Sequence, residues 1–260
     1  MVVENGEWIM RGLAWDDPYR IRSLRELVNW INEVGFLPLF ANNIVGFSVE
    51  EHVSLDYWWT GDTEQDPWEW REIIAAGHEV AYGKFFDKKA GFISLEWLPY
   101  FANYRRDGYD FDSAWEESRV NRREKLIMDI LTDTDSEGEM VWTNKQILST
   151  DLKRIAGFGK NGEKNFPGIT TDLMMKTYLV TADFRRRVNK KGSEYGMAVS
   201  VLTPPEAIWG YDRVTSAYVE STHDSWKRIV DRVKMLYPDA NETDITKLIG
   251  KEPTNDNNNH

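Results

Sequence analysis

Acidic side chains at the start of a predicted helix are the first candidates for acid–base chemistry. Asp66, Glu69 and Arg71 fall within the stretch DPWEWREIIAAG at residues 66–77, and a positioned carboxylate can act as a general base. The same spacing fits helix capping, because Asp66 directly precedes Pro67 and acids are stabilised at a helix N-terminus. Capping is the favoured interpretation, with Asp66, Glu69 and Arg71 kept as candidate catalytic residues.

Neither a metal nor a cofactor is predicted. The chain has no cysteine, and its 4 histidines lie far apart without an H-E-x-x-H motif. The run GFGKNGEKN at 157–165 contains a G-x-G-x-x-G order. It follows a helical pattern instead of a strand, which disfavours dinucleotide binding. The sequence also contains no G-x-S-x-G or P-loop lysine motif.

Positive charge is concentrated in one short stretch of an acidic chain. The net charge is -11, yet FRRRVNKKGSEYG at 184–196 carries five cations within seven positions: Arg185, Arg186, Arg187, Lys190 and Lys191. Screening limits a surface charge to about 8 Å in physiological salt, so a local patch can attract a polyanion despite the overall charge. This stretch is the first candidate for a nucleic-acid contact.

The elements around this basic stretch predict a winged helix-turn-helix. Four segments have helical patterns: NRREKLIMDILT, TNKQILS, TDLKRIAG and GITTDLMMKTYL. Two β-rich runs joined by VNKKGSE follow them. In such a module the third helix, here 168–178, enters the major groove and the hairpin wing touches phosphates. Further predicted DNA contacts are Lys160, Lys164, Lys176, Arg105 and Arg106.

The N-terminal part of the chain predicts helices at 23–35 and 66–77 and a hairpin around a turn at 87–89. Residues 40–115 are rich in tryptophan. Core packing of these rings is the favoured interpretation, and a base-stacking platform is the alternative.

The predicted fold class is α+β, with winged-helix modules and a small β-rich, barrel-like element. The expected domains are an aromatic-rich region at 1–118, a winged-helix domain at 119–203, a C-terminal helical segment at 204–250 and a disordered tail at 251–260. The sequence shows neither a signal peptide nor an apolar run of membrane-spanning length, so we expect a cytoplasmic protein with no membrane contact.

The order of EVGFLPLF, KKAGFISLEWLPYFANYRR and NRREKLIMDIL resembles the AlkZ/YcaQ-like winged-helix DNA glycosylases, and more closely the AlkZ-related set. The resemblance implies a bacterial DNA-repair scaffold of tandem winged helices around a small β-barrel, binding double-stranded DNA without a metal. Active relatives carry a Gln-x-Gln or Gln-x-Asp pair after the first helix. Here Pro38, Leu39 and Phe40 occupy that region, and Lys88 falls where those enzymes have a histidine. Side chains of Pro and Phe offer no hydrogen-bonding group for a water.

Three functional hypotheses stay open from the sequence. The leading one is a DNA-binding protein that lacks the family's catalytic residues. The second is an active glycosylase with a rebuilt site around Asp66, Glu69, Arg71 and Lys88, in which a desolvated lysine would act as nucleophile or base. The third is a module that binds a protein partner, which the acidic first half of the chain would favour. A positive groove joining the wing to Lys160, Arg105 and Arg106 would favour DNA.

Overall fold

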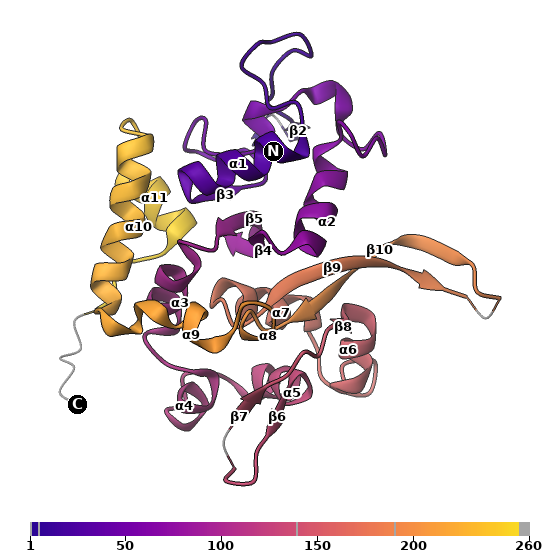
Figure 1. Ribbon diagram of the computed structural model, residues 1–260, viewed down its shortest axis with the longest axis vertical. Coiled ribbons are helices and arrows are strands. Elements are labelled where there is room, and N and C mark those ends of the chain that lie inside the picture. The colour runs from indigo at the N-terminus through magenta and orange to yellow at the C-terminus, as the bar shows by residue number, and fades with distance from the viewer. Residues whose placement is uncertain (1, 5, 139, 190, 255–260) are drawn as a thin grey trace.

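The computed structural model describes residues 2–4, 6–138, 140–189 and 191–254, and has a mixed α+β architecture (Figure 1). Its helices are α1 (Leu24–Val34), α2 (Pro67–Gly77), α3 (Leu98–Arg106), α4 (Phe111–Glu116), α5 (Arg122–Leu131), α6 (Ser149–Ile155), α7 (Phe166–Met175), α8 (Glu206–Trp209), α9 (Tyr211–Val214), α10 (Thr222–Leu236) and α11 (Glu242–Ile249). Its strands are β1 (Val2–Glu4), β2 (Glu7–Ile9), β3 (Phe36–Pro38), β4 (Val80–Phe86), β5 (Lys89–Ser94), β6 (Thr132–Thr134), β7 (Met140–Trp142), β8 (Ile147–Leu148), β9 (Val180–Val188) and β10 (Glu194–Thr203).

The first hydrophobic core surrounds a three-stranded antiparallel sheet with the order β3-β5-β4. Side chains of α1, α2, α3, α10 and α11 pack in the same core, so the C-terminal helices join the N-terminal part of the chain. Within the described residues, β3 and β4 each pair only with β5, which leaves both outer edges of the sheet open. The expected barrel-like element is therefore an open sheet.

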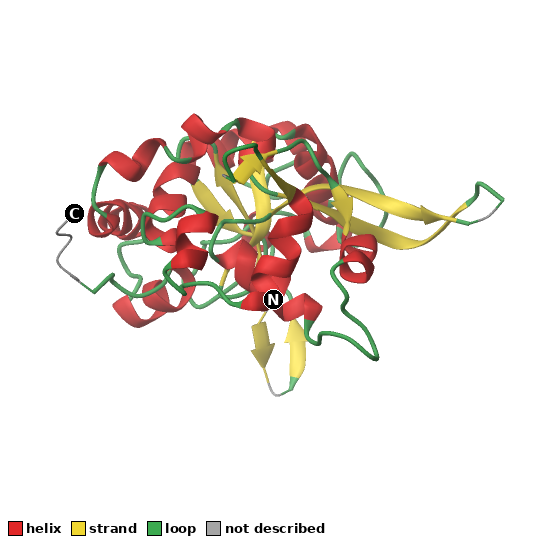
Figure 2. Cartoon of the chain, turned by 90° about the horizontal axis from the view of Figure 1, so that it is seen from below, coloured by secondary structure: helices red, strands yellow, loops and turns green. Residues whose placement is uncertain are grey.

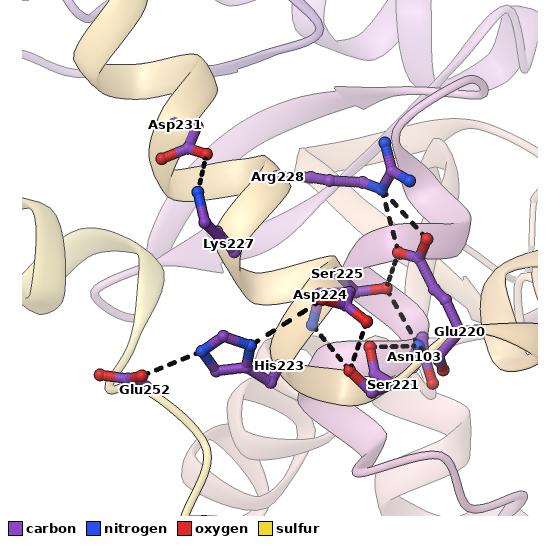
Figure 3. A network of polar contacts seen from close by, with 10 residues as sticks. All are labelled: Asn103, Glu220, Ser221, His223, Asp224, Ser225, Lys227, Arg228, Asp231 and Glu252. Carbon is purple, nitrogen blue, oxygen red and sulfur yellow. Dashed lines mark hydrogen bonds and ion pairs between the residues drawn. The ribbon is translucent and has the colours of Figure 1, made fainter.

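Helix α10 is attached to α3 by a polar network as well as by apolar packing (Figure 3). The buried Asn103 side chain donates to Ser225 Oγ at 3.0 Å and to the Glu220 carbonyl at 3.1 Å. Ser225 in turn donates to Glu220 Oε1 at 2.7 Å, and Arg228 Nε donates to Glu220 Oε2 at 3.0 Å. Each buried group in this set has a partner, so the network fixes the position of the helix.

The second core is built by α4, α5, α6 and α7 together with Leu202 of β10. Asn121 and Glu124 cap α5 through a complete capping box, with the Glu124 carboxylate accepting from Asn121 N at 2.8 Å. The predicted helix at TNKQILS is wrong, because Ile147 and Leu148 pair with β10 as strand β8 before α6 begins. The order is thus helix α5, the antiparallel strands β6 and β7, strand β8, helices α6 and α7, and then the hairpin β9–β10.

Strands β9 and β10 form a long hairpin that extends well beyond the rest of the molecule (Figures 1 and 2). The inner half of β10 pairs with β8 on one side and with β9 on the other, in a sheet of order β8-β10-β9. Their outer halves are solvent-exposed on both strands, from Arg185 to Asn189 and from Lys191 to Met197 in the described part. Gly192 in the turn has φ +81°, a left-handed conformation that glycine adopts without steric cost.

A buried ion pair lies where the two cores meet. Arg106 at the end of α3 contacts Glu206 of α8 at 2.5 Å, and both side chains are fully inaccessible to solvent. Arg106 Nη2 also donates, at 2.7 Å, to the carbonyl of Thr177, which follows Lys176, the C-cap of the second-core helix α7. In the described part of the chain, no helix is both long and apolar enough to span a membrane.

Candidate nucleic-acid interface

Helix α7, the predicted major-groove helix, is largely covered by other parts of the chain. It runs from Phe166 to Met175 instead of the expected 168–178, and six of its residues are buried. The β4–β5 turn lies against it: Lys88 Nζ is 3.3 Å from Asp172, and the backbone N–H of Lys88 is 3.4 Å from the sulfur of Met175. The β4–β5 turn thus covers α7 around Asp172 and Met175, which obstructs insertion of that part of the helix into a major groove.

The hairpin cations differ in what they contact. Arg185 Nε binds Asp183 at 2.7 Å, and the Arg187 guanidinium lies 5.0 Å from the centre of the Tyr195 ring. Arg186 has neither a hydrogen-bond nor an ion-pair partner among the described residues, and Lys191 is exposed. Lys190 lies outside the described residues. Arg185, Arg186 and Arg187 are all exposed on the outer half of β9, with Arg186 on the opposite face of the strand from Arg185 and Arg187.

The other predicted contacts divide into exposed and internal groups. Lys160 is exposed, and Lys164 Nζ folds back onto the carbonyl oxygens of Gly159, at 2.6 Å, and of Lys160. Lys176 binds the buried carboxylate of Glu124 at 2.7 Å, so its charge compensates the α5 capping box. Lys160 and Lys164 lie on the surface, whereas Lys176 forms an ion pair with Glu124 in the second core.

The guanidinium groups of Arg105 and Arg106 make internal contacts; Arg106 is buried and Arg105 is half-buried. Arg105 donates to the carbonyl of Phe85 at 2.6 Å and its guanidinium lies 4.7 Å from the Phe101 ring centre. Burial lowers the pKa of Arg105 to about 10. Arg106 is engaged by Glu206. The expected positive groove through this pair is thus interrupted, because neither guanidinium faces solvent.

Two of the four candidate catalytic residues, Asp66 and Lys88, lie in positions that do not suit catalysis. Asp66 is fully buried as the N-cap of α2, where its carboxylate accepts from Trp68 N at 2.8 Å and Gly61 N at 3.0 Å. Lys88 lies in the β4–β5 turn with φ +62° and is 69% exposed, so it lacks the desolvation that would activate a lysine. The other two, Glu69 and Arg71, line a cavity.

This cavity has a volume of about 630 Å³ and lies between the first core and the hairpin. One wall is formed by Trp68, Glu69, Arg71 and Glu72 of α2. The remaining walls come from β4, α7 and the central parts of β9 and β10, where the buried and the exposed halves of the hairpin meet. They include Tyr82, Lys84, Phe166, Thr170, Phe184, Arg186 and Met197. The volume falls within the range of about 300–1,000 Å³ that is typical of small-molecule sites.

Arg71 is fixed between two aromatic rings at the cavity wall. Its guanidinium carbon lies 3.6 Å from the ring centre of Trp68 and 4.3 Å from that of Phe184. Nη2 binds Glu72 Oε1 at 2.8 Å, whereas the buried Nε has no hydrogen-bond partner in the described structure. Burial raises the pKa of Glu72, and the nearby Glu69 raises it further against the opposing effect of Arg71 and Arg186.

The sequence pointed to Glu69, Glu72 and Arg71 on one helix, but it did not predict that Trp68 and Phe184 join them in one site. The spacing of Trp68, Arg71 and Glu72 places them within one turn of α2, which was a detectable signal. The contribution of Phe184 was not detectable, because it comes from a strand more than one hundred residues away. Only the packing of the hairpin against α2 brings these groups together.

Fold and site define a mixed α+β protein in which a projecting basic hairpin borders a cavity with aromatic and acidic walls. The chain belongs to the AlkZ-related family, because the sequence model of that family matches residues 21–250. Membership relates the chain to the AlkZ DNA glycosylases. Neither a curated protein nor a solved structure matches the chain.

The residues expected in place of the family's glutamine-containing pair are mostly internal. Pro38 is buried, and Leu39 is fully buried in the first core. Phe40 is partly buried and its ring centre lies 5.7 Å from Trp58 and 6.3 Å from the cavity residue Trp68. This segment therefore supports the aromatic wall from behind.

Proposed function

We propose that the protein binds double-stranded DNA through the β9–β10 hairpin. The observation that carries this proposal is the row of adjacent arginines Arg185, Arg186 and Arg187 on a hairpin that projects into solvent. Arginine suits phosphate binding because its planar guanidinium forms two parallel hydrogen bonds. Relation to the AlkZ glycosylases supports DNA as the polyanion.

The element order supports a winged-helix module with an unusual use. The described order α5, β6, β7, β8, α6, α7, β9, β10 and the sheet order β8-β10-β9 resemble those of a winged helix, with β9–β10 as the wing and β6–β7 as an insertion. Because the β4–β5 turn contacts α7 at Asp172 and Met175, we expect that α7 does not read base edges in the major groove. Contacts through the wing go to phosphates, which position a protein without specifying sequence.

Duplex affinity measured at two salt concentrations tests the proposal. We expect fluorescence anisotropy with a labelled duplex to show binding at low salt that weakens steeply at higher salt, because bound cations release counterions from DNA. Two duplexes of unrelated sequence should bind with nearly equal affinity. Absence of binding at low salt would contradict the proposal, and strong sequence preference would contradict the phosphate-only mode.

A second candidate function, base excision, is favoured by one observation. Glu69 and Glu72 line the same cavity next to an aromatic wall, and burial raises the pKa of Glu72. A carboxylate in such surroundings can activate water for attack on a sugar carbon. If this candidate is right, incubation with methylated or crosslinked duplexes should release base, and Glu72→Gln should reduce that release by at least about 100-fold. No release from any duplex would exclude it.

A further inference from the structure

An aromatic surface is exposed where residues 13–19 pack beside residues 53–65, in the N-terminal part of the chain. Four large side chains form it, with exposed fractions of 61% for Trp15, 87% for Tyr19, 41% for Leu55 and 53% for Trp59. We call these two segments the aromatic face. Trp15 and Tyr19 precede the residues that the family model matches, so the family relationship does not account for them. Exposed apolar side chains gathered in one patch mark an interaction site.

The buried side chain of Arg20 holds the two segments of the aromatic face together. Its Nε donates to the carbonyl of Trp15 at 2.5 Å, and its Nη1 donates to Oε1 of Gln65 at 3.4 Å. The guanidinium carbon lies 5.5 Å from the ring centre of Tyr57. Residues 15, 57 and 65 thus surround one side chain, which places the two segments next to each other.

Trp59 is presented to solvent by an unusual backbone conformation. Its φ is +59°, in the left-handed region that a bulky side chain seldom adopts. The ring centre lies 5.6 Å from Trp58 and 6.3 Å from Trp68, so other indoles support the ring while about half of the residue stays exposed. Conformations of this kind concentrate at binding sites, where the strain serves to present a group.

The charge of the aromatic face has one sign. Residues 13–19 and 53–66 contain six acidic side chains and no lysine or arginine. Four of the six are exposed: Asp16, Asp56, Asp62 and Glu64. Guanidinium groups stack on aromatic rings and pair with carboxylates, so a surface that offers both suits an arginine-rich segment.

The chain carries such a segment in the outer half of the β9–β10 hairpin. Arg185, Arg186, Arg187 and Lys191 are exposed there, together with the apolar side chains of Tyr195 and Met197. The hairpin projects away from the body of the molecule in both views, which makes its outer half accessible to a second molecule (Figures 1 and 2). Its charge and its apolar surface both complement the aromatic face.

We propose that the outer half of the hairpin of one copy docks on the aromatic face of a second copy. Each copy offers one hairpin and one face, so the contact is head-to-tail and can add further copies unless a ring closes. The inference does not rest on DNA binding. Because a duplex and a second copy would use the same arginines, each would exclude the other from the hairpin.

Sedimentation velocity of the full chain, freed of nucleic acid by nuclease treatment, tests this inference. At low salt, we expect the weight-average mass to rise above the 30.3 kDa of one chain as the protein concentration increases. At high salt the mass should return to that of the monomer, because salt screens exposed charges. A monomer at every concentration in low salt would overturn the proposal.

Two variants, each lacking one half of the contact, make the test specific. The face variant combines Trp15→Ala, Asp16→Asn, Tyr19→Ala and Glu64→Gln, and the hairpin variant combines Arg185→Ala, Arg186→Ala and Arg187→Ala. Each variant alone should need at least about tenfold more protein to associate. An equimolar mixture should form a complex that stops at one copy of each, because only one intact hairpin and one intact face remain.

Failure of the mixed variants to form this complex would overturn the proposal, as would unchanged association of either variant alone. The control variant, Glu117→Gln with Asp239→Asn, neutralises two exposed acids outside the aromatic face and should associate like the wild type. Circular dichroism verifies the folding of each variant. If the face variant does not fold, Asp16→Asn with Glu64→Gln alone should still weaken association. These measurements contain no DNA, so a failure of the proposed DNA binding leaves their outcome unaffected.

Discussion

Replacing Arg106 by methionine should lower the free energy of unfolding by about 3–5 kcal/mol. The substitution would leave the Glu206 carboxylate buried without its partner, although both side chains are fully inaccessible to solvent. It would also remove the donor to the Thr177 carbonyl at 2.7 Å. Burial opposes the charge on Arg106, but the adjacent Glu206 outweighs it and raises the pKa of Arg106, whereas burial raises the pKa of the Glu206 carboxyl against the effect of Arg106.

Chemical denaturation of a double-substitution cycle measures this effect. Glu206→Met should lower the free energy of unfolding by a similar amount, because it leaves Arg106 buried without an ion-pair partner. The double variant Arg106→Met with Glu206→Met should lose less than the sum of the two, since apolar side chains of similar volume replace both charges. Additive losses would show that the two groups are not coupled. Because Arg106 joins α3 to α8 and to the end of α7, the single variants should also separate the unfolding of the two cores.

Removing the wing arginines should weaken DNA binding more than any other change of equal charge. In the triple variant Arg185→Ala, Arg186→Ala and Arg187→Ala, we expect the salt slope of binding to fall by about two to three units, as each phosphate contact contributes about 0.9. Affinity at low salt should fall by at least about tenfold. The contribution of Arg185 should be the smallest of the three, because Asp183 already binds it at 2.7 Å.

A matched control for this prediction lies at the opposite end of the molecule. Lys227, Lys234 and Lys247 are exposed cations of α10 and α11, far from the hairpin in Figure 1. Replacing these three lysines by alanine changes the net charge by the same amount but should leave the salt slope unchanged. An equal loss in both triple variants would attribute binding to net charge, and an unchanged slope in the wing variant would remove the wing from the interface.

Local patterns in the sequence predicted several elements because the forces that define them act over a few residues. Asp66 before Pro67 marked the start of α2, where its carboxylate does cap the helix. The capping pattern at Ser23 was confirmed in part: Ser23 accepts from Glu26 N, but the Glu26 carboxylate binds Arg22 N at 2.7 Å. The turn at 87–89 was correct, as Asp87 and Lys88 both have positive φ.

The sequence by itself determined the mixed α+β character, the order of the helices before the hairpin, and the clustering of arginine at the wing. Its errors arose where distant segments meet. Residues 147–148 form a strand because they pair with β10. The β4–β5 turn contacts α7 at Met175, a contact that the local sequence does not predict. The sequence predicted that Arg105 and Arg106 contact DNA, but both guanidinium groups bind partners inside the protein, because α3 packs between the two cores.

The cavity beside α2 also depends both on local sequence patterns and on contacts between distant segments. A sequence records that Trp68, Glu69, Arg71 and Glu72 share a helix, since their spacing is local. Whether those side chains face solvent, core or a ligand depends on what packs opposite them, and that partner is Phe184 on a strand far along the chain. Tertiary structure alone decided that the wing base closes over α2, because burial and charge pairing act between surfaces that no local pattern encodes.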